Sequence, residues 1–69
     1  MNTITTDVRA LNPGDIVTTT AGQFKVNTTF IDPALPEGII TLVMTHIRSG
    51  REVTVEVEKA QTYDVERIL

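Results

Sequence analysis

The chain's basic cluster surrounds one predicted turn, 48–51. His46, Arg48 and Arg51 lie within six consecutive residues. Guanidinium groups bind phosphate or carboxylate oxygens through paired hydrogen bonds, and a neighbouring histidine can add a further contact. These three residues are therefore a candidate anion contact. The alternative is a solvated turn whose charges keep the exposed tip soluble.

The sequence lacks the residues that usually carry out catalysis or bind a metal ion. His46 is the sole histidine and there is no cysteine, so a zinc site would lack its common ligands. Ser49 is the sole serine and falls in a turn, and no glycine-rich phosphate loop or nucleophile–base pair is present. We expect no enzyme, no catalytic residue, no metal site and no cofactor. His46 is expected at a partly buried rim, opposite Val53.

A row of carboxylates runs along the second half of the chain. Paired carboxylates can perform acid–base work or bind a hard cation, but both need a concave site, and this row is predicted on a convex strand face. A solvated face is the simpler interpretation, and a surface for a basic partner is the alternative. The row consists of Glu52, Glu56 and Glu58, continued by Asp64 and Glu66.

The net charge of −3 is concentrated in residues 52–69, which hold five acids against two bases. Nucleic-acid binding requires neutralisation of phosphates, so general affinity for DNA or RNA is not expected. The sequence has no apolar run of membrane-spanning length and no basic-then-apolar N-terminal region. A cytoplasmic protein with no membrane association is therefore expected.

The carboxylate row belongs to a predicted β-hairpin over residues 39–59. Its second half alternates strictly, so three valines share one face and the glutamates share the other. An even-length loop places three apolar residues of the first half beside the valines, and an odd loop places them opposite the glutamates. Burial selects the even register. The predicted inner residues are Val53, Val55 and Val57 with Ile40, Leu42 and Met44.

The whole chain is predicted to be all-β and to form one domain, 1–69. Valine, isoleucine and threonine supply 27 of 69 residues, and no window shows helical spacing of apolar residues. Residues 1–6 carry no turn or cap signal and are expected to be mobile. The strand beginning at Phe24 is expected to turn its alternate residues to the core: Phe24, Val26, Thr28 and Phe30.

Apolar residues outside the predicted core indicate an interaction surface. In the even register Ile39, Val43 and Ile47 form a strip on the outer face of the hairpin. Either another segment covers this strip, such as residues 4–8, or it is an interface. Leu35, between the two prolines of the 32–38 loop, either folds back on the domain or meets a partner.

Five predicted strands in 69 residues favour a small bent barrel, because closure covers the apolar face and hides the edges. A series of short motifs runs through nearly the whole chain: Val8-x-x-Leu11-x-Pro13-Gly14-Asp15-x-Val17, Gly22-x-Phe24-x-Val26, a Pro- and Gly-containing loop, a hairpin turning at Arg48-Ser49-Gly50, and Tyr63-Asp64-Val65-Glu66. In order and approximate spacing these motifs resemble the SH3-like (KOW-like) N-terminal domain of elongation factor P. The sequence is also similar to small proteins of actinobacterial phages, most of which have no assigned function.

The resemblance implies a five-stranded SH3-like barrel with one long central hairpin. In the elongation factor the loop corresponding to residues 32–38 carries a modified lysine, and this chain has no lysine there. The implied fold survives this departure, and the peptidyl-transfer role does not. We expect a non-enzymatic interaction module, phage-encoded, that binds a host or phage protein or self-associates. The alternatives are a nucleic-acid- or ribosome-associated module and a minor virion structural protein.

Overall fold

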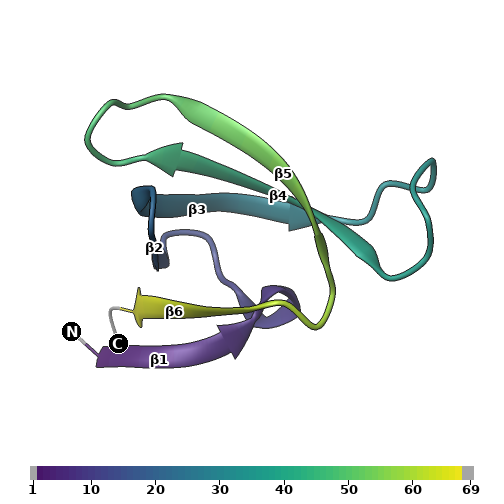
Figure 1. Ribbon diagram of the computed structural model, residues 1–69, viewed down its shortest axis with the longest axis horizontal. Helices are drawn as coiled ribbons and strands as arrows, with labels where there is room; N and C mark the ends of the chain where they lie inside the picture. The colour runs from purple at the N-terminus through teal and green to yellow at the C-terminus, as the bar shows by residue number, and fades with distance from the viewer. Residues whose placement is uncertain (1, 68–69) are drawn as a thin grey trace.

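The strands of this protein form one antiparallel sheet, described for residues 2–67 by a computed structural model. In Figure 1, β3, β4 and β5 run above β6 and β1, and the chain crosses between the two groups after β5. The sheet order is β1-β6-β2-β3-β4-β5. The prediction of an all-β chain is confirmed. The elements are β1 (Asn2–Asp7), the 3-10 helix η1 (Val8–Ala10), β2 (Ile16–Thr19), β3 (Gly22–Phe30), β4 (Ile39–His46), β5 (Glu52–Glu58) and β6 (Thr62–Arg67).

The prediction of a five-stranded closed barrel is wrong in both strand number and closure. The additional strand is β1, which includes residues 2–6 of the segment that was expected to be mobile and pairs with β6 from Asn2–Arg67 to Asp7–Thr62. Its threonines are β-branched and favour extended backbone, while Ile4 packs against the core. Because β1 pairs with the far side of β6, the sheet ends at β1 and β5 and does not close.

The hairpin of β4 and β5 has the predicted faces. Ile40, Leu42 and Met44 are buried and pair with the half-buried Val57, Val55 and Val53, while the glutamates of β5 are exposed. His46 shares this inner face but lies opposite Arg51, since its N–H donates to the Arg51 carbonyl at 2.8 Å. The predicted partner, Val53, is opposite Met44 instead. A shift of two residues preserves the faces and changes only the partners.

A bulge in β3 moves Phe30 to the outer face. Val26 pairs with Met44 but Thr28 pairs with Val43, so Asn27 is the extra residue. One inserted residue reverses the alternation that follows it. Phe24 and Val26 are buried as predicted, whereas Thr28 is exposed and Phe30 is 48% exposed. The expectation that all four residues face the core is therefore wrong for the last two.

An ion pair between Asp15 and Arg67 of β6 stabilises the turn before β2. Asp15, only 3% exposed, accepts the Asn12 N–H at 2.9 Å, as Asp and Asn side chains commonly do in turns. Arg67 approaches the same carboxylate with two nitrogens, at 3.0 and 2.6 Å, and also donates to the Ala10 carbonyl. This pairing joins β6 to the turn that precedes β2.

The core lies on the inner face of the bent sheet. Val8 and Leu11 are buried in it, and the partly buried Tyr63 packs against the core cluster. One row of paired residues crosses four strands from β6 to β4: Val65, Val17, Phe24 and His46. Within residues 2–67, the structure contains no helix with the length and hydrophobicity needed to cross a membrane.

Candidate functional site

Three large apolar side chains are exposed outside the core. Ile31 is 76% exposed, Ile47 is 51% exposed and Phe30 is 48% exposed. Phe30 and Ile31 are adjacent at the point where β3 ends and the 32–38 loop begins. Ile47 belongs to the hairpin tip, and Figure 1 shows that this tip and the 32–38 loop lie at opposite ends of the sheet.

A groove of about 440 Å³ lies beneath the 32–38 loop, and we call it the proline-loop groove. Its apolar lining combines the end of β3, both prolines of the loop and the start of β4. Charged residues of both signs complete its rim. The apolar residues are Ile31, Pro33, Leu35, Pro36, Ile39 and Ile40, and the charged ones are Arg9, Asp32, Glu37 and Lys59.

The groove is shaped by the loop's own hydrogen bonds. The Asp32 carboxylate accepts the Ala34 N–H at 2.9 Å, and the Asp32 carbonyl accepts the Leu35 N–H at 3.0 Å. The Ile39 N–H donates to the Pro36 carbonyl at 3.3 Å, which closes the second turn. Two fixed proline φ angles further restrict this backbone. A ligand would therefore meet a largely preformed surface.

Some charged residues at the rim of the groove are already in ion pairs, and others are not. Arg9 is already paired with Asp7 at 3.0 Å, and this hydrogen bond lowers the pKa of the Asp7 carboxyl. Lys59 and Glu37 form no ion pair within residues 2–67. The groove therefore combines an apolar lining with charged groups of both signs that form no ion pair within residues 2–67.

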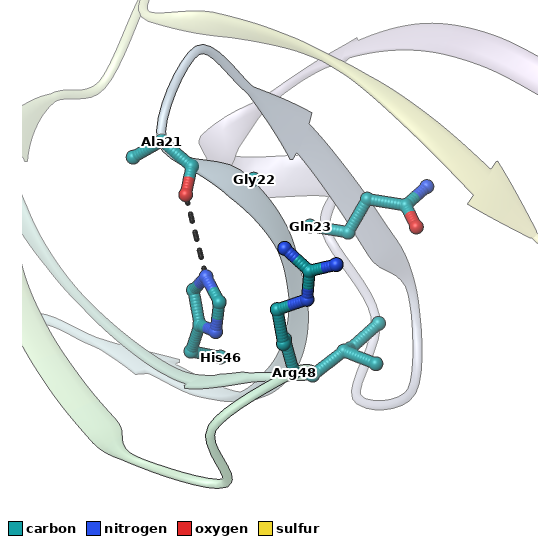
Figure 2. Close-up of a pocket in the computed structure, with 6 residues that line it drawn as sticks. Ala21, Gly22, Gln23, His46 and Arg48 are labelled. Carbon is teal, nitrogen blue, oxygen red and sulfur yellow. Dashed lines mark hydrogen bonds between the residues drawn. The ribbon is translucent and has the colours of Figure 1, made fainter.

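A second hollow, of about 360 Å³, lies at the hairpin tip and is drawn in Figure 2. His46 spans it, with Nε2 at 3.3 Å from the Ala21 carbonyl oxygen. The Ser49 N–H donates to Nδ1 at 3.2 Å, so Nδ1 is the acceptor and the proton lies on Nε2. His46 also meets Phe24 edge-on, with 4.9 Å between ring centroids. Both ring nitrogens are engaged, and His46 therefore ties the hairpin tip to the β2–β3 turn.

The predicted anion cluster is only partly assembled. Arg48 lines the hollow beside His46, and Figure 2 shows its guanidinium near Gln23 and Gly22. Arg51 does not line this hollow. Within the described chain neither arginine forms an ion pair. The arginines are exposed, but His46 contributes structure to the hollow and has no free nitrogen for an anion.

The four predicted interface residues separate into three places. The structure brings Leu35 and Ile39 together in the proline-loop groove. Val43 is half-buried on the outer face of β4, and Ile47 lies beyond the end of β4 at the tip hollow. Residues 4–8 were one of the two alternatives for covering the outer strip, but residues 2–7 pair with β6 instead.

Sequence reasoning missed Ile31, the most exposed large apolar residue of the described chain. The available signal was its position directly before Asp32-Pro33, where the strand ends and the next turn begins. The exposure of Phe30 had no such signal, since it depends on the bulge.

Within residues 2–67 no group of three or more His, Cys, Asp or Glu side chains is arranged to hold a metal ion. Comparison of the chain with protein-family models, with curated proteins and with solved structures gives no significant match.

Proposed function

We propose that this protein is a small non-enzymatic interaction module that binds another protein through the proline-loop groove. The observation that carries the proposal is Ile31, which is 76% exposed at the rim of a preformed apolar groove. Leu35 and Ile39 line the same groove. Protein-binding sites concentrate their energy in a few apolar anchors that become fully desolvated.

Burial of Ile31 by a partner gives a substantial driving force. Complete burial of an isoleucine side chain is worth roughly 1.5–3 kcal/mol. Phe30, the preceding residue, is 48% exposed but does not line the groove. The partner is a host or phage protein, or a second copy of the chain. We further propose a phage-encoded accessory protein in the cytoplasm of the host cell, and this part of the proposal rests only on the resemblance noted in the sequence.

We also propose that the fold is a relative of the SH3-like (KOW-like) barrels. The order of strands supports this proposal, because β2 to β5 form a continuous meander and β6 returns to pair with β2. The short η1 and the added β1 lie outside that meander. A nucleic-acid- or ribosome-associated role is the second candidate, favoured by the exposed and unpaired Arg48 and Arg51. A minor virion subunit would use the same groove against a neighbouring protein.

The test compares two identical substitutions at opposite ends of the sheet. Ile31→Lys places a charge in the groove, and Ile47→Lys makes the same change at the hairpin tip, where the side chain is also exposed. Both variants should keep the wild-type melting temperature, since exposed positions tolerate substitution. Self-association is measured by sedimentation, and a partner captured from host lysate is identified, purified and titrated by calorimetry.

Ile31→Lys is expected to abolish the association, and Ile47→Lys is expected to leave it unchanged. A fully folded Ile31→Lys variant that still binds or self-associates with wild-type affinity would overturn the proposal. Loss through Ile47→Lys alone would move the binding surface to the tip hollow.

A further inference from the structure

The sheet has a second surface suited to a partner, the free edge of β5. This strand pairs with β4 on one side and, within residues 2–67, has no neighbouring strand on the other. Open edges present rows of backbone donors and acceptors that can accept another strand. Figure 1 shows β5 along the outside of the sheet, unobstructed by the segments drawn.

The hydrogen-bond parity of the hairpin identifies which groups are free. At one end the His46 N–H donates to the Arg51 carbonyl, and at the other the Lys59 N–H donates to the Gly38 carbonyl, both at 2.8 Å. Bonded pairs alternate with unbonded pairs in an antiparallel ladder. The three valines of β5 therefore bond to β4. The residues whose N–H and C=O point away from β4 are Glu52, Thr54, Glu56 and Glu58.

The inner face of this edge is incompletely covered. Val53, Val55 and Val57 are only half-buried, although their partners in β4 are buried. An added strand would place its own inward side chains beside these valines and extend the core by one row. The opposite edge, β1, offers one apolar residue, Ile4, so β5 is the better template.

The acidic side chains on the outer face of β5 favour a partner strand with basic side chains. Glu56 and Glu58 form no ion pair within residues 2–67, and Glu52 accepts a bond from the Asn27 amide at 3.3 Å. The strand itself carries no basic residue. A second copy pairing through β5 would align glutamates with glutamates, which disfavours self-association at this edge. Lysine or arginine at alternate positions of the added strand would face these carboxylates instead.

We propose that the β5 edge binds an extended segment of another protein, in which apolar residues alternate with lysine or arginine. This inference deepens the proposed function, because it names the chemistry of a partner segment. The segment adds to β5 as a seventh strand, with its apolar side chains over the valines and its cations beside the glutamates. Backbone hydrogen bonds supply affinity, and the alternating pattern supplies specificity.

The experiment titrates the protein with a short end-blocked peptide of alternating valine and lysine. Two control peptides are used: one has the same composition with all lysines grouped at one end, and one alternates valine with glutamate. Chemical shifts and amide hydrogen exchange are read for each residue of β5. The alternating lysine peptide should slow exchange at the outward amides of Thr54, Glu56 and Glu58, and the controls should not.

A proline variant tests strand addition directly. Thr54→Pro removes an outward N–H and leaves the bonds to β4 intact, because edge strands tolerate proline where the N–H faces solvent. It should weaken peptide binding by roughly tenfold or more. Ile31→Lys, in the proline-loop groove, should bind the peptide like the wild type. Thr54→Pro should bind any partner of the proline-loop groove with wild-type affinity. The failure of one proposal can therefore be distinguished from the failure of the other.

Three outcomes overturn the inference. One is no peptide binding by the wild-type protein, and the second is equal binding of the peptide with grouped lysines, which indicates charge attraction without pairing. The third is undiminished binding by folded Thr54→Pro. If that variant does not fold, the exchange pattern of the wild-type protein decides, because strand addition must protect the outward amides in particular.

Discussion

Replacing Arg67 with alanine is expected to destabilise the fold strongly, because it leaves a buried carboxylate without its counter-ion. The Asp15 side chain is 4% exposed and the Arg67 side chain is 22% exposed. Three nitrogen contacts hold the carboxylate, two from Arg67 and one from Asn12. Arg67→Ala removes the two charged ones and leaves only the backbone N–H.

The expected loss is about 3 kcal/mol of the free energy of unfolding, at the lower end for a broken buried pair, since the arginine is partly solvated. For a domain of this size that corresponds to a fall in Tm of roughly 12–24 °C. The matched control is Arg9→Ala, which breaks the Arg9–Asp7 pair. Those side chains are 57% and 30% exposed, so solvent screens the pair and the expected loss is much smaller than for Arg67→Ala.

The effect should depend on pH in a defined direction. The hydrogen bond from Arg67 lowers the pKa of Asp15 in the folded state below its ordinary value of 3.8. A lowered folded pKa gives stability that is complete above pH 3.8 and is lost as the pH falls through the folded value. The difference between wild type and Arg67→Ala should therefore be full at neutral pH and shrink in strong acid.

Urea denaturation followed by circular dichroism, at neutral pH and in strong acid, measures both effects. Asp15→Asn and the double variant complete a cycle that isolates the coupling between the two side chains. Equal losses for Arg67→Ala and Arg9→Ala would refute the reasoning. A difference that grows as the pH falls would refute it as well.

Three further predictions concern the core, the hairpin tip and nucleic acid. Leu42→Ala should lower the free energy of unfolding by about 2–5 kcal/mol, because Leu42 is fully buried, and a near-zero change in urea denaturation would contradict its place in the core. Gly22→Ala should lower the Tm, since a Cβ there lies 2.9 Å from His46 Nε2 and the backbone φ is +118°. The same substitution should lower the Tm by less when it is made in the His46→Ala variant, because the steric clash is then absent. The wild-type protein should show no DNA or RNA binding at physiological salt in a fluorescence titration, and binding that disappears with Arg48→Ala and Arg51→Ala together would favour the nucleic-acid role.

The faces of the hairpin were predictable because one strand alternates without a break. Val53, Val55 and Val57 select a single parity, and burial then places Leu42 and Met44 beside them. The exact partners were not predictable, since a shift of two residues leaves every face unchanged. His46 consequently lies opposite Arg51 and not Val53.

Features that depend on contacts between distant residues could not be predicted from the sequence. The bulge at Asn27 is stabilised by the side chain's bond to Thr45, in another strand, and it alone turns Phe30 outward. The buried pair of Asp15 and Arg67 joins residues that are 52 positions apart. Nothing local to either residue indicates the other.

The candidate site was predicted only in part, because only some of its residues have a local signal in the sequence. Leu35 between two prolines and Ile39 at the start of a strand are local signals, and both line the groove. Val43 and Ile47 follow from strand parity, but parity gives only the direction of a side chain. It does not say that β4 ends at His46, which places Ile47 in the tip.

The position of β6 between β1 and β2 has a consequence for the order in which the chain can assemble. In the part of the chain that the structure describes, β1 pairs with β6 alone, although 55 positions separate Asp7 from Thr62. At typical rates of synthesis, β1 is made roughly 3–11 s before its partner. During that interval the meander of β2 to β5 can form, but β1 has nothing to pair with. Removing β6 would therefore release two strands, one from each end of the chain.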